Sequence, residues 1–335
     1  MSHATAPLSR RAMLAAALTG TVALAAPQIA RAQAGATWPN QPVRMILPYA
    51  PGGPTDVIAR LICDTLSQRL PQRVVVENRT GAGGNIGAST VAHAKPDGST
   101  FLFTNTGHAV NRALYAKLDY DPAKDLTPVT IVAEGPMVLL VPNSSPDKTL
   151  AEFVARVRAK PGEYSYGSTG TGGALQLVSL LLAKAAGLKM EEVPYRGSAP
   201  AAQDLIAGRL EMLYDAGATA FPLATAGQAR ALAVSSTQRS TVMPAVPTVA
   251  EAGFPDATFS VWQGLLAPAG TSQSILERFQ AEVAAVLAEG SLRTRLVELG
   301  AERIIANTPA EAQIYVDAEM ERWERVLRDA GVRPQ

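Results

Sequence analysis

The sequence of 335 residues has few of the side chains that build common catalytic centres. It holds one cysteine, Cys63, which excludes an internal disulfide, and beyond His3 its histidines are His93 and His108. Neither of these histidines has a cysteine nearby, so the usual spacing of a metal cluster is missing. The G-x-S-x-G elbow and the P-loop lysine are missing too. We therefore expect no catalytic residues, no metal, no cofactor and no enzyme activity.

Residues 1–32 have the pattern of a cleaved export signal. Arg10 and Arg11 form a twin-arginine start, residues 13–26 are apolar, and an A-x-A site ends at Ala32. The apolar stretch is shorter than the about 20 residues that a membrane span needs, which disfavours an anchor. We expect export to the periplasm with cleavage near Ala32, by the twin-arginine route rather than general secretion.

An excess of charge of one sign is also lacking. The chain has 30 basic and 29 acidic residues; the signal holds three of the basic ones, which leaves 27 against 29, a net charge of −2. Such a balance gives no electrostatic footprint for nucleic acid or an anionic membrane. We therefore expect no nucleic-acid partner.

Cys63 falls on the inner side of a predicted helix, and we interpret it as core packing rather than a nucleophile.

Beyond residue 42, short β-rich runs alternate with helical ones. This alternation favours an α/β fold with mainly parallel strands flanked by helices. The predicted strands are 43–47, 74–76, 101–103, 137–141, 164–167, 192–193, 212–214, 229–235 and 261–266, and the predicted helices are 55–70, 85–94, 150–159, 174–186, 200–207, 273–288 and 309–330.

The length of the chain exceeds one ordinary core and predicts two lobes. The long apolar segment 129–141 is interrupted by Gly135 and Pro136, as expected of a chain that crosses from one lobe to the other. Helices at the end of the chain indicate a return to the first lobe. We predict a first lobe of residues 36–128 and 236–335 and a second lobe of residues 129–235.

Two glycine-rich loops stand between a predicted strand and a predicted helix. Residues 49–56 contain Gly52 and Gly53, which allow close backbone approach, and Thr55 or Asp56 is suited to cap the following helix. Residues 167–173 have similar chemistry. Each loop offers backbone N–H groups to an anion. Either loop alone is also explained as an ordinary strand-to-helix turn, but facing each other the two would clamp a small anion.

Other candidate ligand contacts follow the ends of predicted strands, where ligands bind in parallel sheets. Asn105, Thr106 and His108 follow the strand 101–103, and we favour them as side-chain contacts. The sequence leaves open whether His108 is neutral or ionised. Asp215 ends the strand 212–214 and either contacts a ligand or caps the next segment. Arg60 and Arg196 are better explained by solvated or interlobe ion pairs than by anion binding.

The segment around Gly81, Gly83 and Gly84 invites a dinucleotide-binding interpretation. Ile86 stands where the third glycine of G-x-G-x-x-G belongs, and no acidic residue follows about 20 residues later at a strand end. We interpret this segment as a structural turn.

Taken together and in order, several short motifs resemble the Bug/TctC family of extracytoplasmic solute receptors, the binding component of tripartite tricarboxylate transporters. The resemblance runs almost from end to end. The motifs are Trp38-Pro39, Pro51-Gly52-Gly53 with Thr55-Asp56 and Arg60, Val76-Glu77-Asn78-Arg79, Gly81-Ala82-Gly83-Gly84-Asn85, Pro96-Asp97-Gly98-Ser99-Thr100, Tyr115, Asp125-Leu126-Thr127-Pro128-Val129, Gly167-Ser168, Val193-Pro194-Tyr195-Arg196-Gly197, Arg239, Pro247-Thr248-Val249-Ala250-Glu251-Ala252-Gly253, and Trp262 with Gly264-Leu265 and Ala267-Pro268-Ala269-Gly270.

The resemblance implies a two-lobed periplasmic binding protein of type II that holds a small organic carboxylate between its lobes. It also implies delivery of this ligand to the membrane permease subunits of a tripartite tricarboxylate-type transporter, and we expect a monomer. Gly172 and Gly173 depart from many relatives, which carry serine or a residue of another size there. The expected ligand-binding residues are Tyr49, Ala50, Pro51, Gly52, Gly53, Thr55, Asp56, Asn105, Thr106, His108, Ser168, Thr169, Gly170, Thr171, Tyr195, Ser198, Ala199 and Asp215.

Two other functions remain open at this stage. The first is an exported enzyme, with or without a cofactor, that acts on a small carboxylate, since the twin-arginine route carries folded proteins. The second is a binding module that serves a sensor rather than a permease. The sequence does not identify the carboxylate.

Overall fold

The computed structural model describes residues 1, 3, 38–170, 172–329 and 334. The chain divides into two units, Met1–Trp38 and Pro39–Gln335, and all the helices and strands described below lie in the second. The predicted export signal lies outside the described residues except for Met1 and His3. Among the described helices, none combines the length and apolar character that a membrane crossing requires.

The first sheet mixes parallel and antiparallel strands. Strand β1 pairs in parallel with β2 and β3, while β9 runs antiparallel to both β3 and β4, and β10 is antiparallel to β4. Because β1 lies between two strands, four of its five residues are buried. The strands are β1 (Val43–Leu47), β2 (Val74–Asn78), β3 (Thr100–Asn105), β4 (Leu126–Pro142), β9 (Ser260–Pro268) and β10 (Arg303–Ile304).

The second sheet is built on the other half of β4. This half pairs antiparallel with β7 and β8, and β5 lies in parallel between β7 and the edge strand β6. The strands are β5 (Ser165–Ser168), β6 (Glu191–Pro194), β7 (Met212–Ala216) and β8 (Ala229–Val234). We call the elements around the first sheet the first lobe and those around the second sheet the second lobe. The residue limits predicted for the lobes stay a prediction.

Helix ends follow local sequence signals. Helix α5 begins with a capping box, in which the Glu152 N–H donates to Thr149 Oγ1 and Thr149 N–H donates to Glu152 Oε2. Helix α2 has proline at its first position and ends before Pro71. The helices are α2 (Pro54–Arg69), η1 (Ala82–Gly84), α3 (Asn85–Ala92), α4 (Gly107–Leu114), α5 (Leu150–Ala159), α6 (Ala174–Ala186), α7 (Ser198–Ile206), α8 (Gly217–Thr225), η2 (Pro255–Ala257), α9 (Gln273–Leu287), α10 (Gly290–Glu298) and α11 (Pro309–Asp329).

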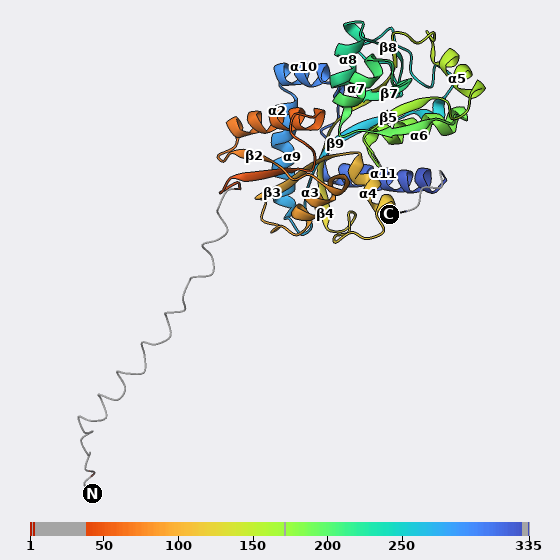
Figure 1. Cartoon of the computed structure of the whole chain (residues 1–335). Coiled ribbons are helices and arrows are strands. Elements are labelled where there is room, and N and C mark those ends of the chain that lie inside the picture. Colours follow the sequence, from red (N-terminus) through yellow and green to blue (C-terminus); the bar gives the residue numbers. More distant parts are fainter. Residues whose placement is uncertain (2, 4–37, 171, 330–333, 335) are drawn as a thin grey trace. The chain divides into compact units, whose positions relative to one another are not determined.

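The C-terminal helices pack against elements from the start of the unit, as Figure 1 shows for the blue helix α9 beside the orange helix α2. Helix α11 packs on α4 and β4, and its Trp323 meets Phe259 edge to face at 5.5 Å. At its end, Asp329 forms an ion pair with Lys184 of α6 at 3.3 Å. Helix α11 therefore contacts elements of both lobes.

Ser235 joins the two chain segments that connect the lobes. Its side chain is fully buried; Ser235 Oγ accepts from Met137 N–H at 2.9 Å and donates to the Phe259 carbonyl at 2.6 Å. Its backbone N–H donates to the Met137 carbonyl at 2.8 Å, and its carbonyl accepts from Phe259 N–H at 2.7 Å. One serine thus links β4 to the segment that leads into β9.

We expect Ser235→Ala to lower the free energy of unfolding by about 1–3 kcal/mol, because it leaves the buried Met137 N–H and Phe259 carbonyl without this partner. Urea unfolding followed by circular dichroism measures the change. Ser291→Ala, at an exposed position in α10, serves as the control and should cost less than about 0.5 kcal/mol. Equal effects of the two substitutions would contradict this role of Ser235.

Candidate ligand-binding site between the lobes

The loop of residues 49–56 is tied to the end of β3. The Tyr49 hydroxyl donates to Asn105 Oδ1 at 2.7 Å and lies 3.1 Å from Thr104 Oγ1. Asn105 Nδ2 in turn donates to Thr55 Oγ1 at 3.2 Å. Burial raises the pKa of Tyr49 to about 12, so its hydroxyl stays protonated and remains a donor. The predicted contacts Tyr49, Thr55 and Asn105 therefore lie together.

Asp56 holds this loop in shape. Its carboxylate accepts from Gly52 N–H at 3.0 Å, from Arg60 at 2.9 and 3.0 Å, and from Asn78 Nδ2 at 2.9 Å. Asn78 Nδ2 also donates to the Tyr49 carbonyl. Burial acts to raise the pKa of Asp56, but these hydrogen bonds outweigh it and hold the pKa below its ordinary value. The ion pair expected for Arg60 is thus formed within the first lobe.

The residues after β3 form a helix, α4, that the sequence analysis did not predict. Thr106 is buried and exchanges hydrogen bonds with Trp262 of β9: Trp262 N–H donates to Thr106 Oγ1 at 3.0 Å, and Thr106 N–H donates to the Trp262 carbonyl at 3.2 Å. His108 is 1% exposed, and neither ring nitrogen has a hydrogen-bond partner among the described residues. Burial lowers the pKa of His108 to about 4, which the nearby Pro122 carbonyl opposes in part, so the ring is neutral at pH 7.

In the second lobe, the loop of residues 168–173 is shaped by side chains. Gly170 N–H donates to Ser168 Oγ at 3.0 Å, and Gly172 N–H donates to Gln176 Oε1 at 2.8 Å. Ser168 Oγ donates to Glu192 Oε1 at 2.5 Å. Two of the backbone amides expected to meet an anion are therefore bonded within the protein. Thr171, also predicted as a contact, lies outside the described residues.

This second loop lies against the first lobe. A methyl group placed on Gly172 would stand 2.1 Å from Leu114 Cδ1 in α4, and Gly172 has a φ of +80°, so the position requires glycine. The structure thus gives Gly172 a place in a close contact between the lobes, while the departure from relatives expected there stays a prediction. Leu114 carried no sequence signal for this role.

The remaining predicted contacts lie at the starts of α7 and α8. The Tyr195 hydroxyl donates to Asp204 at 2.7 Å, and Ala199 is exposed. Asp215 is 1% exposed; its Oδ1 accepts from Ala216 N–H at 2.8 Å, and its Oδ2 has no partner among the described residues. Burial raises the pKa of Asp215 to about 6, although the hydrogen bond from Ala216 N–H acts to lower it.

A crevice of about 20 Å³ is lined by residues of both lobes. Pro54 at the start of α2 and Gln263 of β9 come from the first lobe, and Ala216 and Gly217 come from the second. Gln263 Oε1 is buried and has no partner among the described residues. The volume is enough for about one water molecule. The sequence analysis missed Gln263 and Gly217: Gln263 lies between the motif residues Trp262 and Gly264 but was not itself singled out, and Gly217 stands in none of the quoted motifs.

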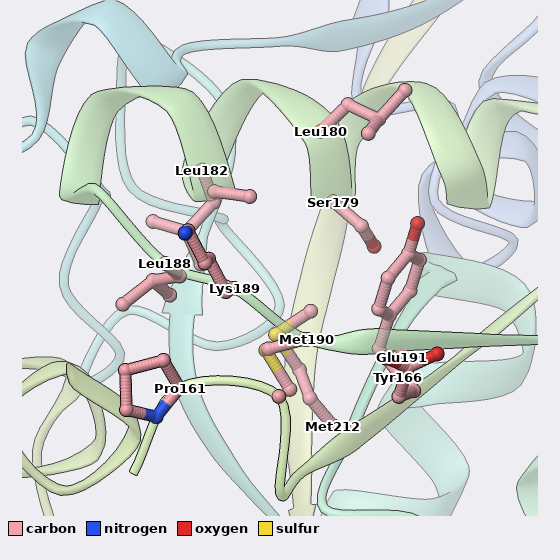
Figure 2. A pocket seen from close by; sticks show the side chains of 12 residues that line it. Pro161, Tyr166, Ser179, Leu180, Leu182, Leu188, Lys189, Met190, Glu191 and Met212 are labelled. Carbon is pink, nitrogen blue, oxygen red and sulfur yellow. The ribbon is translucent and has the colours of Figure 1, made fainter. Parts of the chain in front are cut away.

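A larger cavity, of about 350 Å³, lies within the second lobe beside the C-terminal half of α6 (Figure 2). Leu188, Met190 and Met212 give it an apolar lining, and Tyr166 points its ring toward α6. None of the predicted ligand contacts lines this cavity. The cavity and the crevice between the lobes share no lining residue, so they are separate, and the predicted contacts line neither of them.

The described residues include no group of three or more His, Cys, Asp or Glu side chains that could hold a metal ion. Cys63 is buried, as its position on the predicted helix indicated, and burial raises the pKa of its thiol far above the ordinary value. A thiol in this state is a poor nucleophile.

Residues 58–332 match the family of tripartite tricarboxylate transporter family receptors, TctC. The chain belongs to this family. BugT of Bordetella pertussis is 34% identical over 299 residues, which cover 89% of this chain and 91% of BugT. An R. palustris protein solved with adipate is 39% identical, with a TM-score of 0.82, and the match covers 89% of this chain and 100% of that one. MatC from Rhodopseudomonas palustris, solved with malate, is 36% identical, with a TM-score of 0.78 and coverage of 86% and 99%.

These similarities confirm the resemblance to the Bug/TctC family and the two-lobed α/β fold of a periplasmic binding protein. The chain is a solute-binding receptor of the TctC family. Its relatives are receptors rather than enzymes, which agrees with the small number of catalytic motifs in the sequence.

We expect His108 to destabilise this TctC receptor in acid. The unfolded imidazole binds a proton near pH 6.5 and the folded one only near pH 4, so the unfolded state binds more protons between these values. Relative to His108→Leu, the wild type should lose up to about 3 kcal/mol of unfolding free energy as pH falls from 6.5 to 4. Urea unfolding at several pH values measures the difference; parallel profiles of the two proteins would contradict it.

Asp215 should act in the opposite direction. Its carboxyl binds a proton near pH 6 when folded and near pH 3.8 when unfolded, so its contribution to stability is complete below pH 3.8 and is lost as pH rises through 6. We expect Asp215→Asn to raise the unfolding free energy of the ligand-free protein at pH 7.5 by up to about 3 kcal/mol. The gain should vanish near pH 3.5, and a substitution that destabilises at pH 7.5 would refute the argument.

Proposed function

We propose that this receptor captures a small organic carboxylate between its lobes in the periplasm and delivers it to the membrane permease of a tripartite tricarboxylate-type transporter. The observation that carries the proposal is the crevice where the start of α2 in the first lobe meets the junction of β7 and α8 in the second. Membership in a family of transporter receptors supports delivery of the ligand to a transporter.

The chemistry of the crevice suits an anion held by neutral donors. The first backbone N–H groups of α2 and α8 have no acceptor within their own helices, and the partial positive charge of a helix start favours a carboxylate. Closure of the lobes would complete the site around the ligand. We keep as proposed contacts Tyr49, Ala50, Pro51, Gly52, Gly53, Thr55, Asp56, Asn105, Thr106, His108, Ser168, Thr169, Gly170, Thr171, Tyr195, Ser198, Ala199 and Asp215.

For the ligand we propose a short dicarboxylate. The R. palustris relative was solved with adipate and MatC with malate, and both ligands carry two carboxylates on a short aliphatic chain. One carboxylate would lie at the helix starts and the other toward the loop of residues 168–173. We further propose that the receptor is a monomer and that residues 1–32 direct its export, with cleavage near Ala32.

Isothermal titration of the ligand-stripped protein against malate, succinate, adipate, citrate, glutamate and benzoate tests this function. We expect one-to-one binding of at least one dicarboxylate, and mass spectrometry should recover that ligand unchanged. Absence of binding to all six acids would refute the proposal, and a chemically altered ligand would favour an enzyme.

A pair of glycine substitutions adds a structural control. Gly53 has an ordinary φ of −74°, and a methyl group there would stand 3.5 Å from the Ala50 carbonyl oxygen, so Gly53→Leu should fold. The added side chain stands at the start of α2 and should weaken binding at least tenfold. Gly290→Leu, which adds the same side chain in open space at α10, should bind as the wild type does.

A further inference from the structure

Glu192 lies on the edge strand β6 and is exposed, yet its carboxylate is the centre of a hydrogen-bond network. It accepts from Ser168 Oγ at 2.5 Å and from Gln176 Nε2 at 3.0 and 2.8 Å. Tyr166, whose ring is seen below α6 in Figure 2, lies near this carboxylate, and burial together with the negative charge of Glu192 raises the pKa of its hydroxyl. One carboxylate therefore joins side chains from β5 and α6.

Both of the side chains that Glu192 holds support the loop of residues 168–173. Ser168 donates its hydroxyl proton to Glu192, which leaves its oxygen free to accept from Gly170 N–H at 3.0 Å. Gln176 directs its amide nitrogen to Glu192, which turns its Oε1 toward Gly172 N–H at 2.8 Å. The direction of each bond is thus set by the carboxylate acceptor at the far end.

The neighbouring Glu191 shows that position alone does not create this network. It is also exposed on β6, and no side-chain hydrogen bond or ion pair joins it to the loop in the described part of the chain. Exposed ion pairs contribute little to stability, but bonds to a carboxylate are stronger and more directional than those between neutral groups. The network is therefore suited to order a loop rather than to stabilise the fold.

We propose that Glu192 is the positioning residue for the second-lobe ligand loop: it does not touch the ligand but sets the conformation in which residues 168–170 and 172–173 meet it. This inference rests on the proposed function. It also explains how a loop whose glycine amides are bonded internally keeps one shape, with Gly172 seated against Leu114 of the first lobe.

The test compares Glu192→Ala with Glu191→Ala, which makes the same charge change on the same strand. Titration of both variants with the six acids used for the wild type gives their dissociation constants, thermal unfolding gives Tm, and hydrogen exchange of the ligand-free proteins reports on residues 168–173. For Glu192→Ala we expect binding weakened about tenfold or more, faster exchange in the loop and a Tm within about 2 °C of that of Glu191→Ala. Glu191→Ala should match the wild type in affinity and exchange.

Glu192→Gln provides a second variant of nearly the same shape. Its amide keeps one neutral acceptor oxygen for Ser168 and Gln176, but it loses the charge and replaces Oε2, which accepts from Gln176 Nε2, by an NH2 donor. Its affinity should therefore lie between those of the wild type and Glu192→Ala. Equal affinity of Glu192→Ala and Glu191→Ala overturns the role of Glu192 while leaving the proposed function intact. A loss of affinity that merely follows a large fall in Tm in both Glu192 variants also overturns it. If the wild type binds none of the six acids, the proposed function and the role of Glu192 both fall.

Discussion

Strand β4 is the constraint on which the rest of the structure depends, because one half completes the first sheet and the other half completes the second. Its ladder with β9 extends to Pro136, and its ladder with β7 begins at Met137, so no loop separates the sheets along this strand. At the changeover, a methyl group on Gly135 would stand 1.7 Å from the Gly300 carbonyl oxygen. Only glycine fits there, and the position of each ligand loop relative to the other depends on the path of β4 at this point.

The two buried ionisable groups at the predicted site respond to acid in opposite ways. Between about pH 4 and 6, protonation favours the folded state through Asp215 and the unfolded state through His108. The two contributions are similar in size and largely cancel, so the wild-type protein can show a flat stability profile over this range while each group remains strongly perturbed. Burial of each group without a full set of hydrogen-bond partners lowers the stability of the ligand-free protein. Groups of this kind gather at functional sites, where a ligand supplies the missing partner.

Strongly periodic segments were predictable from sequence, and features set by distant contacts were not. The expected helices 150–159 and 174–186 coincide with α5 and α6, whose apolar faces repeat regularly. Helix α8 escaped prediction because it begins at Gly217 and contains Pro222, both of which normally indicate a turn. The antiparallel direction of β9 depends on where the chain re-enters the first sheet. The sequence located the glycine-rich loops, but the contact of Gly172 with Leu114 requires the tertiary structure.

Several backbone amides of the two glycine-rich loops are hydrogen-bonded within the protein, so we expect ligand recognition at other donors. Gly52, Gly170 and Gly172 direct their N–H groups to Asp56, Ser168 and Gln176, so these glycines shape the loops instead of presenting donors. The amides of Thr55 and Asp56, in the first turn of α2, find no acceptor among the described hydrogen bonds. Buried acceptors also lack partners, since Asp215 Oδ2 and Gln263 Oε1 have none among the described residues. A carboxylate ligand accepts from the unpaired donors, and a bridging water or a hydroxyl group of the ligand donates to the unpaired acceptors. Sequence motifs for anion binding indicate the donors of a site but not the buried acceptors that also need a partner.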